Sequence, residues 1–138
     1  MIFRAKKIEY LFLVLFLILA VLMVNKMFQD KKYQESLKYF VGEGASMEPT
    51  ILDGEEIITD PNKKPEINDI IVFRCEKCKI GLDDIDILTK RLIKENREGC
   101  YWVEGDDKAR SYDSRDFGWL CSSEIEFLGV FIEKVFDK

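Results

Sequence analysis

Hydrophobic and polar positions divide the chain into two parts. Residues 10–24 are uninterrupted apolar sequence and follow a basic N-terminal tip. Alone this run is short for a bilayer, which takes about 20 helical residues. Lys26 can extend its charge to the headgroups, so we expect a membrane-spanning helix over residues 10–28. A cleavable secretory signal is the alternative, but no pair of small residues follows the apolar run, which favours an uncleaved anchor.

The remainder has the pattern of a small β domain. Short runs rich in β-branched and aromatic residues alternate with Gly, Pro, Asn and Asp, which is typical of strands and turns. The expected strands are residues 39–41, 55–59, 70–73, 85–94, 101–103 and 125–136, the last broken at Gly129 by a bulge. We therefore predict an all-β fold of antiparallel sheets. Residues 1–28 would be a tip and anchor, 29–38 a polar tether that continues the helix, and 39–138 one β domain.

The expected strand 85–94 carries one informative lysine. Side chains alternate between the two faces of a strand, which places Leu88, Lys90 and Leu92 on one face. An amine among leucines is desolvated, and desolvation lowers the pKa of a lysine. A neutral amine near pH 7–8 would then be available as a base. The other interpretation is a lysine whose stem packs on the leucines while its charge reaches water.

Composition narrows the chemistry. The net charge is −5 and the sequence pI about 4.9, which argues against nucleic-acid binding because that needs a basic face. The chain has no histidine, which excludes Ser-His-Asp and Cys-His catalysis and histidine-ligated metals. A hydrolase with a side-chain nucleophile would need a lysine or carboxylate base.

Four cysteines leave three alternatives open. Cys75 and Cys78 have the spacing of half a zinc site, but Cys100 and Cys121 are single and 21 residues apart, which makes the match to a four-thiolate site weak. One or two disulfides would fit a compartment outside the cytoplasm. Unpaired structural thiols are the third alternative.

Residues 44–50, with the sequence GASMEPT, contain the candidate nucleophile Ser46. The second glycine of a G-x-S-x-G elbow is missing, and Pro49 favours an extended Glu48. Ser46 is therefore expected on a loop or strand end, where the alternative is a plain turn serine.

Residues 111–118 are too polar for a simple strand and are predicted to be irregular, with a solvated surface loop as the alternative.

Four stretches in order resemble the conserved boxes of type I signal peptidases, the membrane-anchored Ser/Lys proteases that remove signal peptides. They are residues 44–50, 69–73, 90–93 and 105–118. The resemblance implies a small signal-peptidase-like β domain on the extracytoplasmic side of the cell membrane, with a single-pass anchor and a cytoplasmic tip. It implies preprotein signal peptides as substrates, the lipid bilayer as a partner, proximity to the secretion translocon, and no metal or cofactor.

The resemblance also implies residue roles. Ser46 would be the nucleophile and Lys90 the general base. Ser111 would hydrogen-bond and orient the lysine, and Asp113 with Arg115 would brace the site. Substrate and oxyanion contacts would come from Gly44, Ala45, Met47 and Leu88.

Three departures from the family pattern stand out. Gly44 replaces a serine that joins the oxyanion hole in some members, so backbone N–H groups would form that hole here. Asp107 replaces the usual asparagine, and the cap subdomain of larger members is nearly absent. Two other functions are open: a soluble Ser/Lys hydrolase of the self-cleaving repressor type, which the anchor and the acidic charge disfavour, and a catalytically silent tethered β domain that binds a partner.

Overall fold

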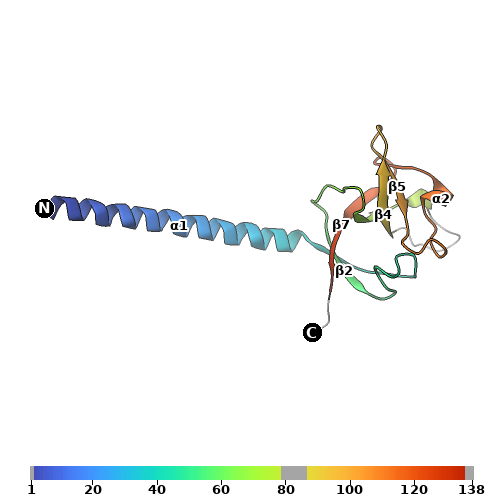
Figure 1. Ribbon diagram of the computed structural model, residues 1–138, viewed down its shortest axis with the longest axis horizontal. Coiled ribbons are helices and arrows are strands. Elements are labelled where there is room, and N and C mark those ends of the chain that lie inside the picture. The colour runs from blue at the N-terminus through green and yellow to red at the C-terminus, as the bar shows by residue number, and fades with distance from the viewer. Residues whose placement is uncertain (1, 79–86, 136–138) are drawn as a thin grey trace. The chain divides into compact units, whose positions relative to one another are not determined.

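A computed structural model describes residues 2–78 and 87–135 of the chain. The chain divides between Ser36 and Leu37 into two compact units, and each is considered by itself. The first is the helix α1 and the second is a β domain (Figure 1).

The helix α1 runs over Ile2–Ser36. Within it, Glu9–Ser36 has a mean hydropathy of 2.6 over its most apolar window, and by length and composition it could span a membrane. A signal sequence near an N-terminus can have the same length and composition. The large apolar side chains described between Tyr10 and Phe28 are exposed, Phe12 and Phe28 among them. The expected helix over residues 10–28 is confirmed, and most of the polar stretch 29–38 continues it.

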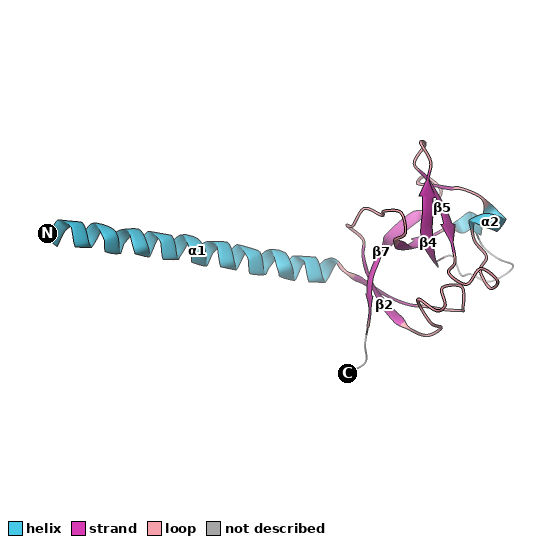
Figure 2. Ribbon diagram, viewed as in Figure 1, coloured by secondary structure: helices cyan, strands magenta, loops and turns pink. Residues whose placement is uncertain are grey.

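The second unit is mostly β, as predicted (Figure 2). Its seven strands form one sheet in the order β1-β2-β7-β3-β4-β5-β6, and every neighbouring pair is antiparallel. The strands are β1 Lys38–Val41, β2 Glu56–Asp60, β3 Ile70–Arg74, β4 Ile87–Glu95, β5 Cys100–Glu104, β6 Leu120–Cys121 and β7 Glu126–Lys134. The first two positions of the expected strand 85–94 lie outside the described residues.

Two short elements differ from the sequence-based expectation. The segment predicted to be irregular contains one helical turn, α2 Ser114–Phe117. The two-residue strand β6 was not predicted, and it pairs with the start of β5. A short 3₁₀ helix, η1 Glu76–Cys78, follows β3.

The break expected at Gly129 is present as a bulge in β7. Val72 of β3 pairs with Gly129 while Phe73 pairs with Phe127, so Leu128 is the additional residue. A Cβ atom at Gly129 would lie 2.6 Å from the Thr59 hydroxyl oxygen of β2. Only glycine therefore allows β7 to approach β2 this closely.

Strand β3 lies between two hydrophobic clusters. Ile71 and Phe73 belong to the cluster that includes Leu92, whereas Ile70 and Val72 belong to the cluster that includes Met47. Because successive side chains of a strand point to opposite faces, β3 is buried on both. The second cluster matters for the site, since it buries the residue that follows Ser46.

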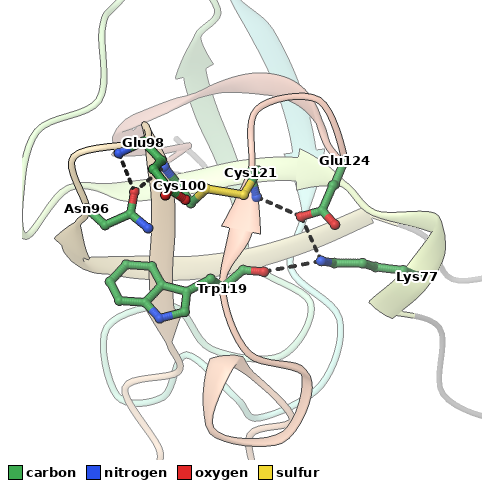
Figure 3. The surroundings of a disulfide bond; sticks show 7 residues. All are labelled: Lys77, Asn96, Glu98, Cys100, Trp119, Cys121 and Glu124. Carbon is green, nitrogen blue, oxygen red and sulfur yellow. Dashed lines mark hydrogen bonds and ion pairs between the residues drawn. A yellow bond between two sulfur atoms is a disulfide. The ribbon is translucent and has the colours of Figure 1, made fainter.

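Both cysteine pairs form disulfides, which excludes the zinc and free-thiol alternatives. Cys75–Cys78 joins the end of β3 to η1, and Cys100–Cys121 joins β5 to β6. The Cys121 N–H donates to Glu124, whose carboxylate also pairs with Lys77 (Figure 3). The second bond thus fixes β6, which has only two residues of its own, against the sheet.

Candidate active site

An open groove of about 530 Å³ lies in the β domain. The segment from Phe40 to Met47 lines it together with the first four residues of β4, Ile87 to Lys90. Ile51, Arg110 and Tyr112 complete the lining. The groove is therefore bounded by strand β4 and by the segment that runs from the end of β1 into the turn that holds Ser46, and both Ser46 and Lys90 line it.

Ser46 lies in a turn that the protein interior holds in place. The N–H of Glu48 donates to the Ala45 carbonyl at 3.1 Å, and the N–H of Ile51 donates to the Met47 carbonyl at 2.9 Å. The Met47 side chain is buried in the second hydrophobic cluster. Burial of the next residue anchors the turn and leaves Ser46 at the groove, on a loop as predicted.

Gly105 packs directly on the back of this turn. A Cβ atom there would lie 2.5 Å from the Ser46 carbonyl oxygen and 2.2 Å from the Ser111 hydroxyl oxygen. The same Ser46 carbonyl accepts a hydrogen bond from the Asp107 N–H at 3.0 Å. Only glycine allows the 105–107 turn to contact the turn of Ser46 at this distance.

Lys90 reaches Ser46 from the middle of β4. It pairs with Ile71 of the buried strand β3 and is only 3% exposed. Its Nζ lies 2.8 Å from the Ser46 Oγ. The predicted proximity of the two groups is thus present in the structure, although 44 residues separate them in sequence.

Burial lowers the pKa of Lys90 from 10.5 to about 8, and the negative charge of Asp113 opposes part of that effect. As an ammonium, Lys90 donates its hydrogen bond to the Ser46 hydroxyl. As a neutral amine, it can accept the hydroxyl proton instead. A lysine tuned in this way can act as a general base in mildly alkaline solution.

Arg91, the next residue of β4, points to the opposite face and braces the strand. Its guanidinium donates two hydrogen bonds to the Asp106 carboxylate, at 2.7 and 2.6 Å, and a third to the Asn68 carbonyl at 2.8 Å. The Thr50 hydroxyl also donates to Asp106. The Arg91 hydrogen bond is the main reason why the pKa of Asp106 is lowered. This network joins β4, the 105–107 turn and the serine turn.

Asp113 is fully buried behind the lysine. Its carboxylate accepts from the Gly105 N–H at 2.9 Å, the Ser111 hydroxyl at 2.7 Å and the Arg115 guanidinium at 2.7 and 2.9 Å. Burial alone would raise the pKa of Asp113, but these hydrogen bonds, that from Arg115 first, hold it well below its usual value. Asp113 also caps α2. The predicted Asp113–Arg115 pair is therefore present as an ion pair.

The contact predicted for Ser111 differs. Its hydroxyl donates to Asp113 at 2.7 Å, and the described part of the chain contains no hydrogen bond between Ser111 and Lys90. The hydrogen bond from Ser111 is thus made to Asp113, and the orienting role of Ser111 toward Lys90 stays a prediction. Ser111 is linked to Lys90 through Asp113, which accepts the Ser111 hydrogen bond and whose charge acts on the pKa of Lys90.

The other predicted residues line the groove. They are Gly44, Ala45, Met47 and Leu88, and their substrate contacts stay predictions, as do the catalytic roles of Ser46 and Lys90. Sequence reasoning did not single out Glu43, Arg110 or Tyr112, which also line the groove. The sequence signal for them was only their position beside or inside the matched stretches 44–50 and 105–118. It is the folded chain that brings them to one groove.

Among the described residues, no group of three or more Cys, Asp and Glu side chains could hold a metal ion. A hydroxyl against a buried, readily deprotonated amine is the pair that a serine–lysine hydrolase uses.

Comparison with known families leads to the same class. A family model described as Peptidase S24-like matches residues 20–132. This is most of the chain, which therefore belongs to the Peptidase S24-like family. Family membership indicates a serine peptidase of the Ser/Lys type. It therefore supports the predicted Ser/Lys peptidase class, which signal peptidases share, and not signal peptidases specifically. No curated protein matches the chain significantly.

Proposed function

We propose that the chain is a membrane-anchored endopeptidase that cleaves signal peptides from preproteins, with Ser46 as nucleophile and Lys90 as general base. The observation that carries the peptidase part is the 2.8 Å hydrogen bond between Lys90 Nζ and Ser46 Oγ, formed by an amine that is only 3% exposed. Family membership supports the same chemistry.

The proposed reaction has two steps. Neutral Lys90 takes the Ser46 proton while the serine oxygen attacks the scissile carbonyl, and backbone N–H groups, that of Ser46 among them, stabilise the oxyanion by about 3 kcal/mol each. The Lys90 ammonium then protonates the leaving amine as the peptide C–N bond breaks. Lys90, now neutral again, takes a proton from a water molecule, which hydrolyses the acyl-enzyme ester. Lys90 then returns the proton to the Ser46 oxygen and regenerates the hydroxyl.

The membrane part of the proposal rests on α1 and on the disulfides. The helix is long and apolar enough to span a bilayer. Disulfides persist mainly in oxidising compartments, and both cysteine pairs of the β domain are bonded. These features favour a single-pass protein whose β domain lies outside the cytoplasm. There, anchoring would raise the effective concentration of membrane-bound preproteins near the translocon.

The test is cleavage of a preprotein in detergent by the wild-type chain, Ser46→Ala and Lys90→Ala. We expect a cut after the signal peptide by the wild type and loss of that cut in both variants. Undiminished cleavage by either variant would overturn the proposed roles. Retained fractionation into membranes would show that the variants are still inserted.

Self-cleavage is the second candidate, because membership of the Peptidase S24-like family is as compatible with a self-cleaving hydrolase as with a signal peptidase. Incubating the purified chain alone separates the two. A Ser46-dependent cut within the chain, at a rate independent of its concentration, would favour self-cleavage. A chain that stays intact while it cleaves a preprotein would favour the signal-peptidase function. A silent binding domain would show neither activity, and Ser46 would resist a serine-directed acylating inhibitor.

A further inference from the structure

Among the described residues, one carboxylate, Glu43, and two basic side chains, Lys90 and Arg110, line the groove. Arg110 is already compensated, because its guanidinium pairs with Glu48 at 2.6 Å and with Asp107 at 2.6 Å. These two carboxylates hold the arginine at the groove wall. Arg110 therefore brings no unmatched positive charge to a substrate.

Glu43 is different. Its side chain is exposed, and within the described part of the chain its carboxylate forms no hydrogen bond or ion pair. The backbone around it is nevertheless fixed, because the Gly42 N–H donates to the Glu55 carbonyl at 2.8 Å and the Gly44 N–H donates to the Asp53 carboxylate at 2.8 Å. The groove thus presents one carboxylate at a defined position with its charge unmatched.

The charge balance favours a cationic substrate group. In the reactive form Lys90 is neutral. Glu43, Glu48 and Asp107 then carry three negative charges against the single positive charge of Arg110. A lysine or arginine of a bound peptide would gain from this field. An acidic side chain would be repelled by Glu43 and would also raise the pKa of Lys90, leaving less neutral amine near pH 7.

We propose that Glu43 is a specificity-determining residue that favours a basic side chain in the peptide substrate. This rests on the proposed peptidase function. Glu43 lies three positions before Ser46 in the chain, so their Cα atoms are at most about 11 Å apart, the span of about three residues of an extended peptide. The preferred basic residue therefore lies within about three residues of the scissile bond.

The experiment uses the full chain in detergent and a series of fluorogenic peptides with one cleavage sequence. At each of the three positions on either side of the cut, the peptide carries Lys, the similarly shaped but uncharged Met, or Glu. Because ion pairs at exposed sites contribute little, we expect kcat/KM with Lys at one position to exceed that with Met by about two- to fivefold. The preference should shrink in 1 M salt, where the Debye length is about 3 Å.

Variants assign the preference to its residue. Glu43→Gln should cut the Lys and Met peptides at equal rates, and Glu43→Lys should prefer the Glu peptide. Glu66→Gln is the matched control, because Glu66 is an exposed loop carboxylate that does not line the groove. It should retain the wild-type preference.

The outcomes distinguish this inference from the proposed function. Ser46-dependent cleavage without a charge preference would overturn the role of Glu43 alone, as would a preference that survives in Glu43→Gln. A wild-type preference for the Glu peptide would assign selection to Arg110 and overturn the inference. Absence of any Ser46-dependent cleavage would overturn the proposed function and this inference with it.

Discussion

The amine of Lys90 lies 2.8 Å from the hydroxyl of Ser46, and the two groups come from elements of different kinds. Lys90 lies within β4, and its side chain is packed so that the residue is only 3% exposed. Ser46 belongs to a turn whose next side chain, Met47, is buried. A strand and an anchored turn hold the pair, so the geometry is preorganised rather than formed by a mobile loop.

The first prediction concerns the pH dependence of cleavage. Burial lowers the pKa of Lys90 to about 8, and the base must be neutral to accept the serine proton. We expect kcat/KM to fall about tenfold per pH unit below pH 8 and to level off above it. Measuring kcat/KM from pH 6 to 10 with an uncharged substrate checks this. A rate constant that does not change over that range would contradict a titrating lysine base.

The second prediction is that the lysine destabilises the fold. The pKa of Lys90 is about 8 in the folded chain and 10.5 as its ordinary value. Between these pH values the unfolded chain binds a proton that the folded chain does not, so stability rises with pH across this window. Below pH 8 the full cost of burying the ammonium, about 3 kcal/mol, is present.

Lys90→Met should therefore abolish cleavage and yet increase the free energy of unfolding by about 1–3 kcal/mol at pH 7, after allowance for the hydrogen bond lost to Ser46. The gain should diminish as the pH approaches 10.5. Thermal unfolding of both chains at several pH values measures it. A variant less stable than the wild type at pH 7 would show that the ammonium reaches solvent.

Local periodicity predicted the face of β4 that carries Lys90, but it left open whether the amine is buried or reaches water. Alternation in 85–94 placed it with Leu88 and Leu92, and the structure buries Lys90 and Leu92. The run of residues 70–73 was correctly expected to be a strand, and it is buried on both faces because a strand without polar positions has no face for solvent.

What sequence reasoning missed depends on contacts between distant segments. Strand β6 has two residues, and contacts with distant β5 hold it: Cys121 is bonded to Cys100 and Leu120 pairs with Tyr101. Helix α2 is one turn long, too short to form by propensity alone. It is held by the Asp113 cap and by the Ser114 hydroxyl, which accepts from the Val103 N–H at 2.9 Å. The choice of Ser111 between Asp113 and Lys90 as a partner likewise depends on the folded arrangement.

The third prediction concerns Gly105. In Gly105→Ala the new methyl group would collide with the Ser46 carbonyl and the Ser111 side chain, so the turn must move away from the nucleophile. We expect cleavage to fall at least a hundredfold, by the loss that misplacement of about 1 Å can cause. Gly99→Ala is the control, since that position has φ +75 but open space around it. It should cost about 1–2 kcal/mol in stability and leave kcat/KM unchanged.

The fourth prediction separates the two disulfides. Cys100–Cys121 closes a loop of 21 residues and Cys75–Cys78 one of 3. In the chain-entropy model these bonds contribute about 3 and about 1.5 kcal/mol. Replacing each pair by serine and measuring the free energy of unfolding checks the order. An equal or larger loss from the Cys75–Cys78 pair would show that packing of its buried sulfur atoms, rather than loop closure, sets the contribution.

The fifth prediction uses Asp113 to separate support of the fold from tuning of the lysine. Asp113→Asn removes the partner of Arg115 and weakens the bonds to Gly105 and Ser111, and we expect a loss of about 3 kcal/mol in stability. The Asp113 charge raises the pKa of Lys90. The folded Asp113→Asn protein should therefore lose kcat/KM at a lower pH than the wild type, which shifts the acid limb of its pH–rate profile.

Asp116→Asn is the matched control for that shift. Asp116 takes part in the same helix cap, accepting from the Asp113 N–H at 3.0 Å, but it is exposed and contributes nothing to the pKa of Lys90. It should lower stability slightly and leave the acid limb in place. An unmoved acid limb in Asp113→Asn, or an equal shift in both variants, would mean that the charge of Asp113 does not act on Lys90, so that burial alone sets its pKa.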